Sequence, residues 1–118
     1  MTITQDDLRQ FTGTEGYTRV NFFGKRVLLT DGANYLAENG ASWLIDIIMS
    51  VFPRWGGEDF VSVKLTVKNE EGLVVMDDGN GNIIYSQKIE FTDFKFNLKL
   101  FVVNYEGTEP VIMLASEY

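Results

Sequence analysis

The sequence contains no cysteine and no histidine. Without cysteine the chain cannot form a disulfide bond, and without either residue it cannot build a Cys/His zinc site. The Ser-His-Asp and Cys-His catalytic arrangements, and any histidine general base, are excluded for the same reason. We therefore expect a protein that is not an enzyme, with no catalytic residue, no metal site and no cofactor.

Long apolar runs are also missing. No stretch approaches the ~18 uninterrupted apolar residues that a membrane-spanning helix needs. The segment 1–7 is acidic and lacks the apolar core of a secretory signal. These absences predict a soluble, cytoplasmic protein that does not interact with a membrane.

Positive charge is scarce. The chain has 10 Lys and Arg residues against 17 Asp and Glu residues, which gives a net charge of −7. Such a balance predicts no direct binding to nucleic acid, because like charges repel. An acidic domain could instead bind a basic partner, including a nucleic-acid-binding protein, although solubility alone also explains the charge. Single lysines between apolar residues suggest solvated strand faces: Lys64, Lys68, Lys88, Lys95 and Lys99.

What is present indicates one folded domain over residues 1–118. The apolar fraction of 45% and the length suit a single hydrophobic core. Apolar spacing predicts helices over 6–11, 33–38 and 43–52, and strands over 17–23, 26–29, 60–68, 73–76, 83–91, 96–105 and 110–114. Because short turns join the later strands, we expect an α+β fold in which an antiparallel β-meander carries two to three helices on one face.

The expected helix 43–52 is apolar around nearly its whole circumference. Only Asp46 and Ser50 interrupt it, four residues apart on one stripe, and Pro53 should end it. A helix of this kind is buried on most sides. Its outer cover could be the N-terminal helix, a long loop or another subunit, so a homo-oligomer is possible.

Carboxylates could carry acid–base chemistry without histidine. Asp46, Asp93, Tyr35 and Arg19 are candidates for a pocket between the helices and the sheet. The alternative is that Asp46 and Ser50 form only the wet stripe of their helix.

The segment 77–82 is rich in Asp, Asn and Gly. It fails the EF-hand spacing, because glycines stand at the third and fifth positions where oxygen ligands are needed. Its Asp-Gly and Asn-Gly dipeptides predict a hairpin turn. A weak cation site is the alternative to a plain turn, and Asp77 and Asp78 are candidates for contact with a protein partner.

The segment 54–59 is expected to be a loop. Within it, Trp55 beside Arg54 is the strongest single candidate for a contact residue, because Trp and Arg often anchor protein interfaces.

Several segments together resemble an uncharacterised family of small bacterial, phage and mobile-element proteins. These are Phe-Thr-Gly-Thr-Glu at 11–15, Thr-Asp-Gly at 30–32 running into Tyr-Leu-Ala-Glu at 35–38, Trp-Leu-Ile-Asp at 43–46, the stretch 87–94 and the final Ser-Glu-Tyr at 116–118. The resemblance implies an accessory role in a bacterial host cell and supplies no function.

The leading functional hypothesis is a non-enzymatic protein-interaction module. In its sharper form, the protein is a phage or mobile-element accessory factor that inhibits a host defence nuclease, as anti-CRISPR proteins do, through an acidic surface. One alternative is a small-ligand-binding or enzymatic domain with a pocket around Asp46. Another is a structural or assembly protein that forms homo-oligomers.

Overall fold

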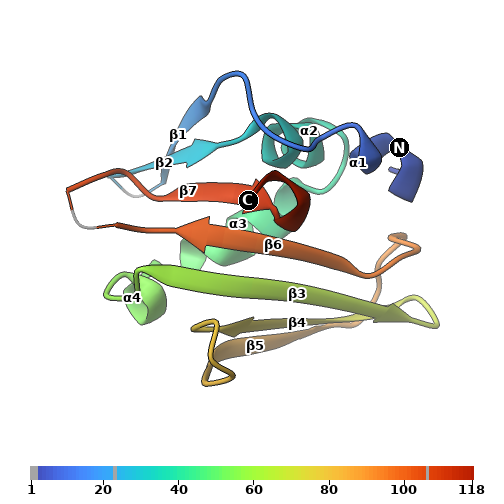
Figure 1. The fold of residues 1–118 in the computed structure, drawn as a ribbon. Helices are drawn as coiled ribbons and strands as arrows, with labels where there is room; N and C mark the ends of the chain where they lie inside the picture. Colours follow the sequence, from blue (N-terminus) through green and yellow to red (C-terminus); the bar gives the residue numbers. More distant parts are fainter. Residues whose placement is uncertain (1–2, 23, 106) are drawn as a thin grey trace.

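The computed structural model describes residues 3–22, 24–105 and 107–118. Its centre is one seven-stranded sheet with helices packed on one face (Figure 1), which confirms the α+β fold class. The helices are α1 (Gln5–Arg9), α2 (Asp31–Glu38), α3 (Ser42–Ser50), α4 (Phe52–Trp55) and the 3-10 turn η1 (Ala115–Glu117). The strands are β1 (Thr18–Phe22), β2 (Lys25–Leu29), β3 (Phe60–Lys68), β4 (Glu71–Asp77), β5 (Ile83–Ile89), β6 (Leu98–Val103) and β7 (Val111–Leu114).

The strand order is β1-β2-β7-β6-β3-β4-β5, so the expected simple meander is only approximate. Strands β3, β4 and β5 do follow one another as antiparallel neighbours. The chain then crosses back, and β6 pairs with the other side of β3. Strand β7 lies between β6 and β2. It pairs antiparallel with β6 and parallel with β2. The segment 90–97 makes the crossover, which the sequence presents only as a break between two strands.

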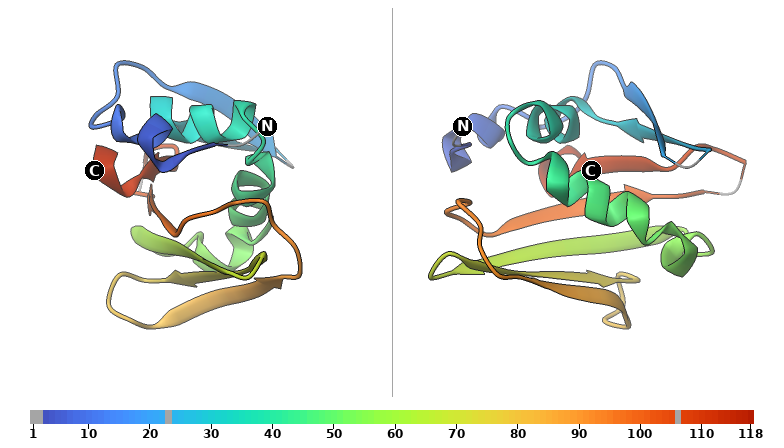
Figure 2. Two further views of the ribbon diagram at one scale, coloured as in Figure 1. Left: turned by 90° about the vertical axis from the view of Figure 1, so that its right-hand side faces the viewer. Right: turned by 180° about the vertical axis from the view of Figure 1, so that it is seen from behind.

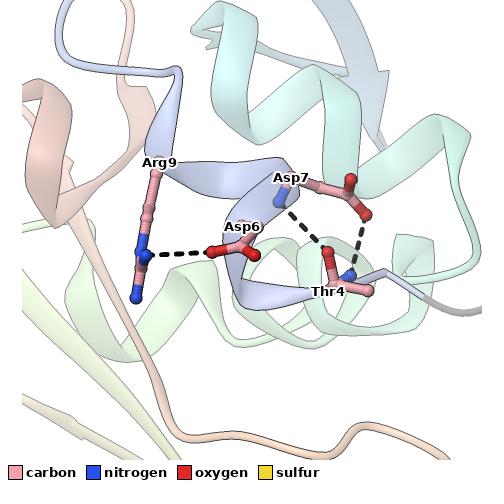
Figure 3. Close-up of polar contacts among 4 residues, drawn as sticks. All are labelled: Thr4, Asp6, Asp7 and Arg9. Atoms are coloured by element: carbon pink, nitrogen blue, oxygen red, sulfur yellow. Dashed lines mark hydrogen bonds and ion pairs between the residues drawn. The ribbon is translucent and has the colours of Figure 1, made fainter.

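Helix α1 begins with a capping box. The Thr4 hydroxyl accepts from the Asp7 backbone N–H, and the Asp7 carboxylate accepts from the Thr4 backbone N–H (Figure 3). These two bonds satisfy donors that a helix start leaves without partners. Arg9 adds an exposed ion pair with Asp6 at 2.9 Å.

Helices α2, α3 and α4 cover one face of the sheet (Figure 2, right). Leu44, Ile45, Ile48 and Met49 of α3 are buried, whereas Asp46 and Ser50 are exposed. Next to this exposed stripe, α3 is covered in part by α2 and by the crossover segment, where the Trp43 ring meets buried Phe94 edge-on at 6.5 Å. This cover comes from the chain itself.

Pro53 does not lead into a loop as expected. It occupies the first turn of α4, a position where a missing N–H costs nothing. The new turn directs Trp55 inward, where it is fully buried and its Nε1–H donates to the Ile48 carbonyl at 2.8 Å. Trp55 therefore has no exposed surface for the partner contact predicted for it.

The two hairpins of the β3–β5 unit differ in their turns. Asn69 and Glu70 join β3 to β4 with φ of 53° and 65°, a left-handed pair that matches strand twist but strains ordinary side chains. The predicted turn at 77–82 is confirmed, with Gly79 and Gly81 at positive φ. Here a register shift between Met76 and Asp77 leaves Ile83 68% exposed. Among the described residues, we found no helix with the length and apolar character needed to cross a membrane.

Candidate binding surface on the open face of the sheet

The sheet face opposite α2, α3 and α4 has no long helix over it among the described residues; only the short helix α1 and the turn η1 lie together at one end of it (Figures 1 and 2). We call this surface the open face. Strand residues alternate between the two faces, and the register fixes which ones belong here. Across the middle of the sheet, Met113 of β7 lies opposite Phe101, which lies opposite Ser62 of β3 and then Asp77 of β4.

Most of the positive charge gathers on the open face. Lys64 of β3 lies directly opposite Lys99 of β6, and the register places four further cations on the same side. Six of the ten Lys and Arg residues therefore share this face, and all six are exposed: Arg19, Arg26, Lys64, Lys68, Lys88 and Lys99. In the sequence these cations are scattered. On each strand, side chains of one face are two residues apart, because the residue between them points to the other face.

Few of these charges are neutralised nearby. Arg19 pairs with Glu109 at 3.5 Å and Lys88 with Glu71 at 3.9 Å, both at exposed positions. No ion pair within the described chain involves Arg26, Lys64 or Lys99. The six cations outnumber the carboxylates on the same face, which are those of Glu71, Asp77 and Glu109, so the open face is locally positive on a protein whose net charge is −7.

An aromatic cluster lies at the centre of the open face. The Phe60 and Phe101 rings are 4.8 Å apart, and the Tyr118 ring packs edge-on to them at 5.5 Å and 5.3 Å. Tyr118 remains 71% exposed, and the Lys99 ammonium lies 5.1 Å from the centre of the Phe101 ring. Such rings supply large contact area to a partner, and a nearby cation adds to the attraction.

Aliphatic side chains surround this cluster. Leu28, Val103, Val111 and Met113 are half-buried on the same face, with no helix of the described chain above them. The open face therefore has an apolar centre with cations around it. This arrangement, an apolar core inside a polar rim, is common in protein–protein interfaces.

The predicted pocket residues do not come together. Asp46 is exposed on the solvent side of α3, which confirms the wet-stripe interpretation. Tyr35 packs against Phe11 with ring centres 5.4 Å apart, and Arg19 lies on the open face. Asp93 lines a hollow of about 580 Å³ beside Trp43 and Phe91 on the helix side. No shared site forms from these four side chains.

Of the predicted interaction residues, only some are available to a partner. Trp55 has no exposed surface. Arg54 is exposed and lies 5.6 Å from the Tyr85 ring on the helix side. Asp77 is buried and its carboxylate accepts from the Gly79 N–H, so it offers little surface for the predicted contact.

Asp78 is engaged in the turn itself. Its carboxylate accepts from the Asn80 and Asn82 backbone N–H groups and from the Asn82 side chain at 2.8 to 3.2 Å. These bonds, led by that of the Asn82 side chain, hold the pKa of Asp78 below its usual value of 3.8. No group of three or more possible metal ligands occurs in the described ranges 3–22, 24–105 and 107–118.

Three distant segments meet at the start of α2, an arrangement we call the Glu117 clasp. The Glu117 carboxylate accepts from the Thr30 hydroxyl at 2.6 Å, the Leu114 N–H at 2.9 Å and the Gly32 N–H at 3.0 Å. Nearby, the Thr14 hydroxyl accepts from the Asp31 N–H at 3.0 Å. The clasp joins the turn η1 to the start of α2, and its hydrogen bonds leave the Glu117 carboxylate well satisfied.

A second hollow lies at the far end of the helix side. It has a volume of about 300 Å³ and is lined mainly by Val27, Met49, Phe52 and Trp55. The Lys25 ammonium lies 4.4 Å from the centre of the Phe52 ring at its border. Its walls are mostly apolar, and no predicted pocket residue lines it. It offers space without a set of converging polar groups.

A scan against protein families matches residues 2–118 to DUF6876, described as a family of unknown function. The chain belongs to this family. Searches of curated proteins and of solved structures gave no match. Membership in DUF6876 confirms the expected uncharacterised family and assigns no activity to the open face.

The segments that carried the sequence resemblance to this family can now be placed. Residues 14, 31–32 and 117 meet in the Glu117 clasp, and the Ser116 hydroxyl donates to the Phe11 carbonyl at 2.7 Å. Trp43 of α3 and Phe94 of the crossover segment, which belong to two other such segments, pack together. These contacts give the named residues a role in holding the fold together, whereas Tyr118 and Lys88 of the same segments lie on the open face.

Proposed function

We propose that this chain is a non-enzymatic protein-interaction module that binds its partner through the open face. The observation that supports it most is the exposed aromatic cluster on a sheet face that no long helix of the described chain covers. Uncovered apolar patches with a polar rim are typical of interaction sites. The candidate acid–base residues, in contrast, lie apart.

Inhibition of a host defence nuclease in a phage or mobile-element setting stays a prediction from the sequence. So does self-assembly into homo-oligomers. What supports the wider proposal is independent of both, because it depends only on the composition and exposure of the open face.

Two exposed aromatic residues on opposite sides of the sheet provide a matched test. Tyr118 is 71% exposed on the open face, and Phe91 is 68% exposed beside the hollow on the helix side. Immobilised wild-type protein, Tyr118→Ala and Phe91→Ala would be incubated with nuclease-treated lysate of the organism that encodes the chain. Bound proteins would be quantified by mass spectrometry.

We expect Tyr118→Ala to reduce the bound partner about tenfold, as truncation of an interface tyrosine commonly does. Phe91→Ala should bind like the wild type. Circular dichroism and thermal unfolding would check that both variants fold. Equal binding by all three proteins, or loss only in Phe91→Ala, would contradict the proposal.

A further inference from the structure

We infer that the partner of the open face is an acidic protein that presents an apolar patch bordered by carboxylates. The inference rests on the proposed function and names the chemistry of its partner. It reverses the expectation from net charge, which was a basic partner, because the surface available for binding is positive although the whole chain is not.

The positions of the cations support this reading. Arg19 and Arg26 lie on β1 and β2 at one edge of the sheet, and Lys88 lies on β5 at the other edge. Lys64 and Lys99 form a pair across β3 and β6, beside the aromatic cluster. Because Arg19 and Lys88 are paired with Glu109 and Glu71, a partner surface that covers the apolar centre would meet positive charge mainly from Lys64 and Lys99 beside the centre and from Arg26 at one edge. Carboxylates placed around its own apolar patch would complement that charge.

The carboxylates elsewhere on the molecule do not cancel this local field. Glu38 and Asp46 belong to α2 and α3 on the opposite side of the sheet, and Asp6 is paired with Arg9 of its own helix. The Debye length is about 8 Å at physiological ionic strength, and a stacked layer alone lies ~10 Å away. An approaching partner is therefore influenced mainly by the charges on the face that it meets.

A second copy of the chain is a poorer occupant. A two-fold symmetric dimer uses the same patch on both subunits. Pairing two open faces would place lysines and arginines of one copy against those of the other, which costs free energy. Complementary charge therefore favours a different protein.

Nucleic acid would also supply negative charge, but the centre of the open face suits it less well. Single strands bind through bases stacked on exposed aromatic rings along a cationic groove. Within the aromatic cluster of the described chain only the Tyr118 ring is largely exposed, and the neighbouring surface is aliphatic, from Leu28, Val103, Val111 and Met113. Aliphatic side chains offer no ring on which a base can stack, whereas they pack well against apolar side chains of a protein.

The open face is large enough for such a partner. Seven strands spaced ~4.8 Å apart span about 30 Å, and nine-residue β3 is about 30 Å long. A standard protein interface buries about 800 Å² on each partner. The face can therefore supply most of one interface without help from the helix side.

The test asks whether the partner is an acidic or a basic protein. A nuclease-treated lysate of the organism that encodes the chain is divided on an anion exchanger into a retained acidic pool and a basic flow-through, and both are adjusted to the same salt. Three baits are compared: wild type, the open-face double variant Lys64→Glu/Lys99→Glu, and the control Arg54→Glu/Lys95→Glu. Both double variants change the net charge equally, and all four side chains are exposed.

We expect a protein captured from the acidic pool by the wild type and by the control variant. The open-face double variant should retain at least about tenfold less of it, and higher salt should release it. The captured protein is then purified and its affinity for the three baits is measured directly. Retention by the open-face double variant, or capture from the basic pool alone, would overturn the inference.

The same baits distinguish failure of the inference from failure of the proposed function. If Tyr118→Ala loses the partner but Lys64→Glu/Lys99→Glu keeps it, the interaction face is correct and the acidic partner is wrong. If neither pool yields a protein, both fail. A fluorescein-labelled 20-nucleotide oligo-dT or oligo-U is titrated in parallel, and binding that Lys64→Glu/Lys99→Glu abolishes would assign the face to nucleic acid instead.

Discussion

Glu117 shows how much a single side chain contributes at the residue scale. Its carboxylate accepts three hydrogen bonds from Thr30, Gly32 and Leu114, two of them from backbone N–H groups. Hydrogen bonds to a charged group are worth about 1.5–3 kcal/mol, and donors left without a partner add a penalty. We expect Glu117→Ala to lower the free energy of unfolding by about 2–4 kcal/mol in urea denaturation.

Ser116 provides the control for this prediction. Its hydroxyl also bonds across the chain, to the Phe11 carbonyl, but at an exposed position. Ser116→Ala should therefore cost less than about 1 kcal/mol, because water replaces the lost bond. If Glu117→Ala and Ser116→Ala lower the free energy of unfolding by similar amounts, the Glu117 clasp does not stabilise the contact between η1 and α2 as described.

Asp78 supplies a pH-dependent prediction. Because its folded-state pKa is held below 3.8 by the Asn82 side chain and the turn N–H groups, folding favours the ionised form. Its contribution to stability is thus present above pH 3.8 and is lost as the pH falls through the lowered pKa. A carbon-13 NMR titration of the Asp78 carboxyl should report a pKa below 3.8.

The variant Asn82→Ala tests the cause of that lowered pKa. Removing the side-chain donor should raise the Asp78 pKa toward its usual value. An unchanged titration curve in the variant would assign the effect to the backbone N–H groups alone.

At the scale of elements, two glycines offer a matched comparison of packing. A Cβ on Gly32 in α2 would lie 2.5 Å from the Glu117 Oε1 and 2.6 Å from the Leu114 Cδ1, whereas a Cβ on Gly57 would meet nothing within 4 Å. We expect Gly32→Ala to destabilise the fold by about 1–3 kcal/mol despite the better helix propensity of alanine.

Gly57→Ala should be neutral or slightly stabilising, because its backbone needs no left-handed conformation. Thermal unfolding of the two variants checks the pair. A Gly32→Ala protein at least as stable as the wild type would show that η1 can move away from α2 at little cost.

Local elements could be predicted from the sequence where one pattern dominates. Strand β3 was predicted at its observed bounds, because Val61, Val63 and Leu65 alternate with polar residues. Alternation does not encode which strands become neighbours, so the crossover that places β6 beside β3 was missed. The α4 turn was missed because Pro53 ends one helix and also suits the first turn of another.

The candidate site was predicted less well than the fold. Its cations were each read as isolated, although Lys64, Thr66 and Lys68 already alternate with inward residues on one strand. Lys64 and Lys68 share a face with Lys99 and Arg26 only because strands that are distant in the sequence pair in the sheet. Trp55 was misplaced because composition alone does not tell a loop from a short helix turn.

At the scale of the whole molecule, the account depends on a difference between the two sides of the sheet. Helices, the crossover and most of the core lie on one side. The other side exposes an aromatic centre and most of the positive charge. The net charge is a sum over the helix side and the open face together. It therefore does not describe the charge of either surface that a partner would meet.

Site-specific photo-cross-linking in living cells tests this central claim most directly. A benzoylphenylalanine is placed at position 64 on the open face or at position 46 on the solvent side of α3, both exposed. The account predicts one discrete heterologous adduct from position 64 and none from position 46. An adduct from position 46 alone, or no adduct from position 64, would contradict the claim that this protein binds through the open face.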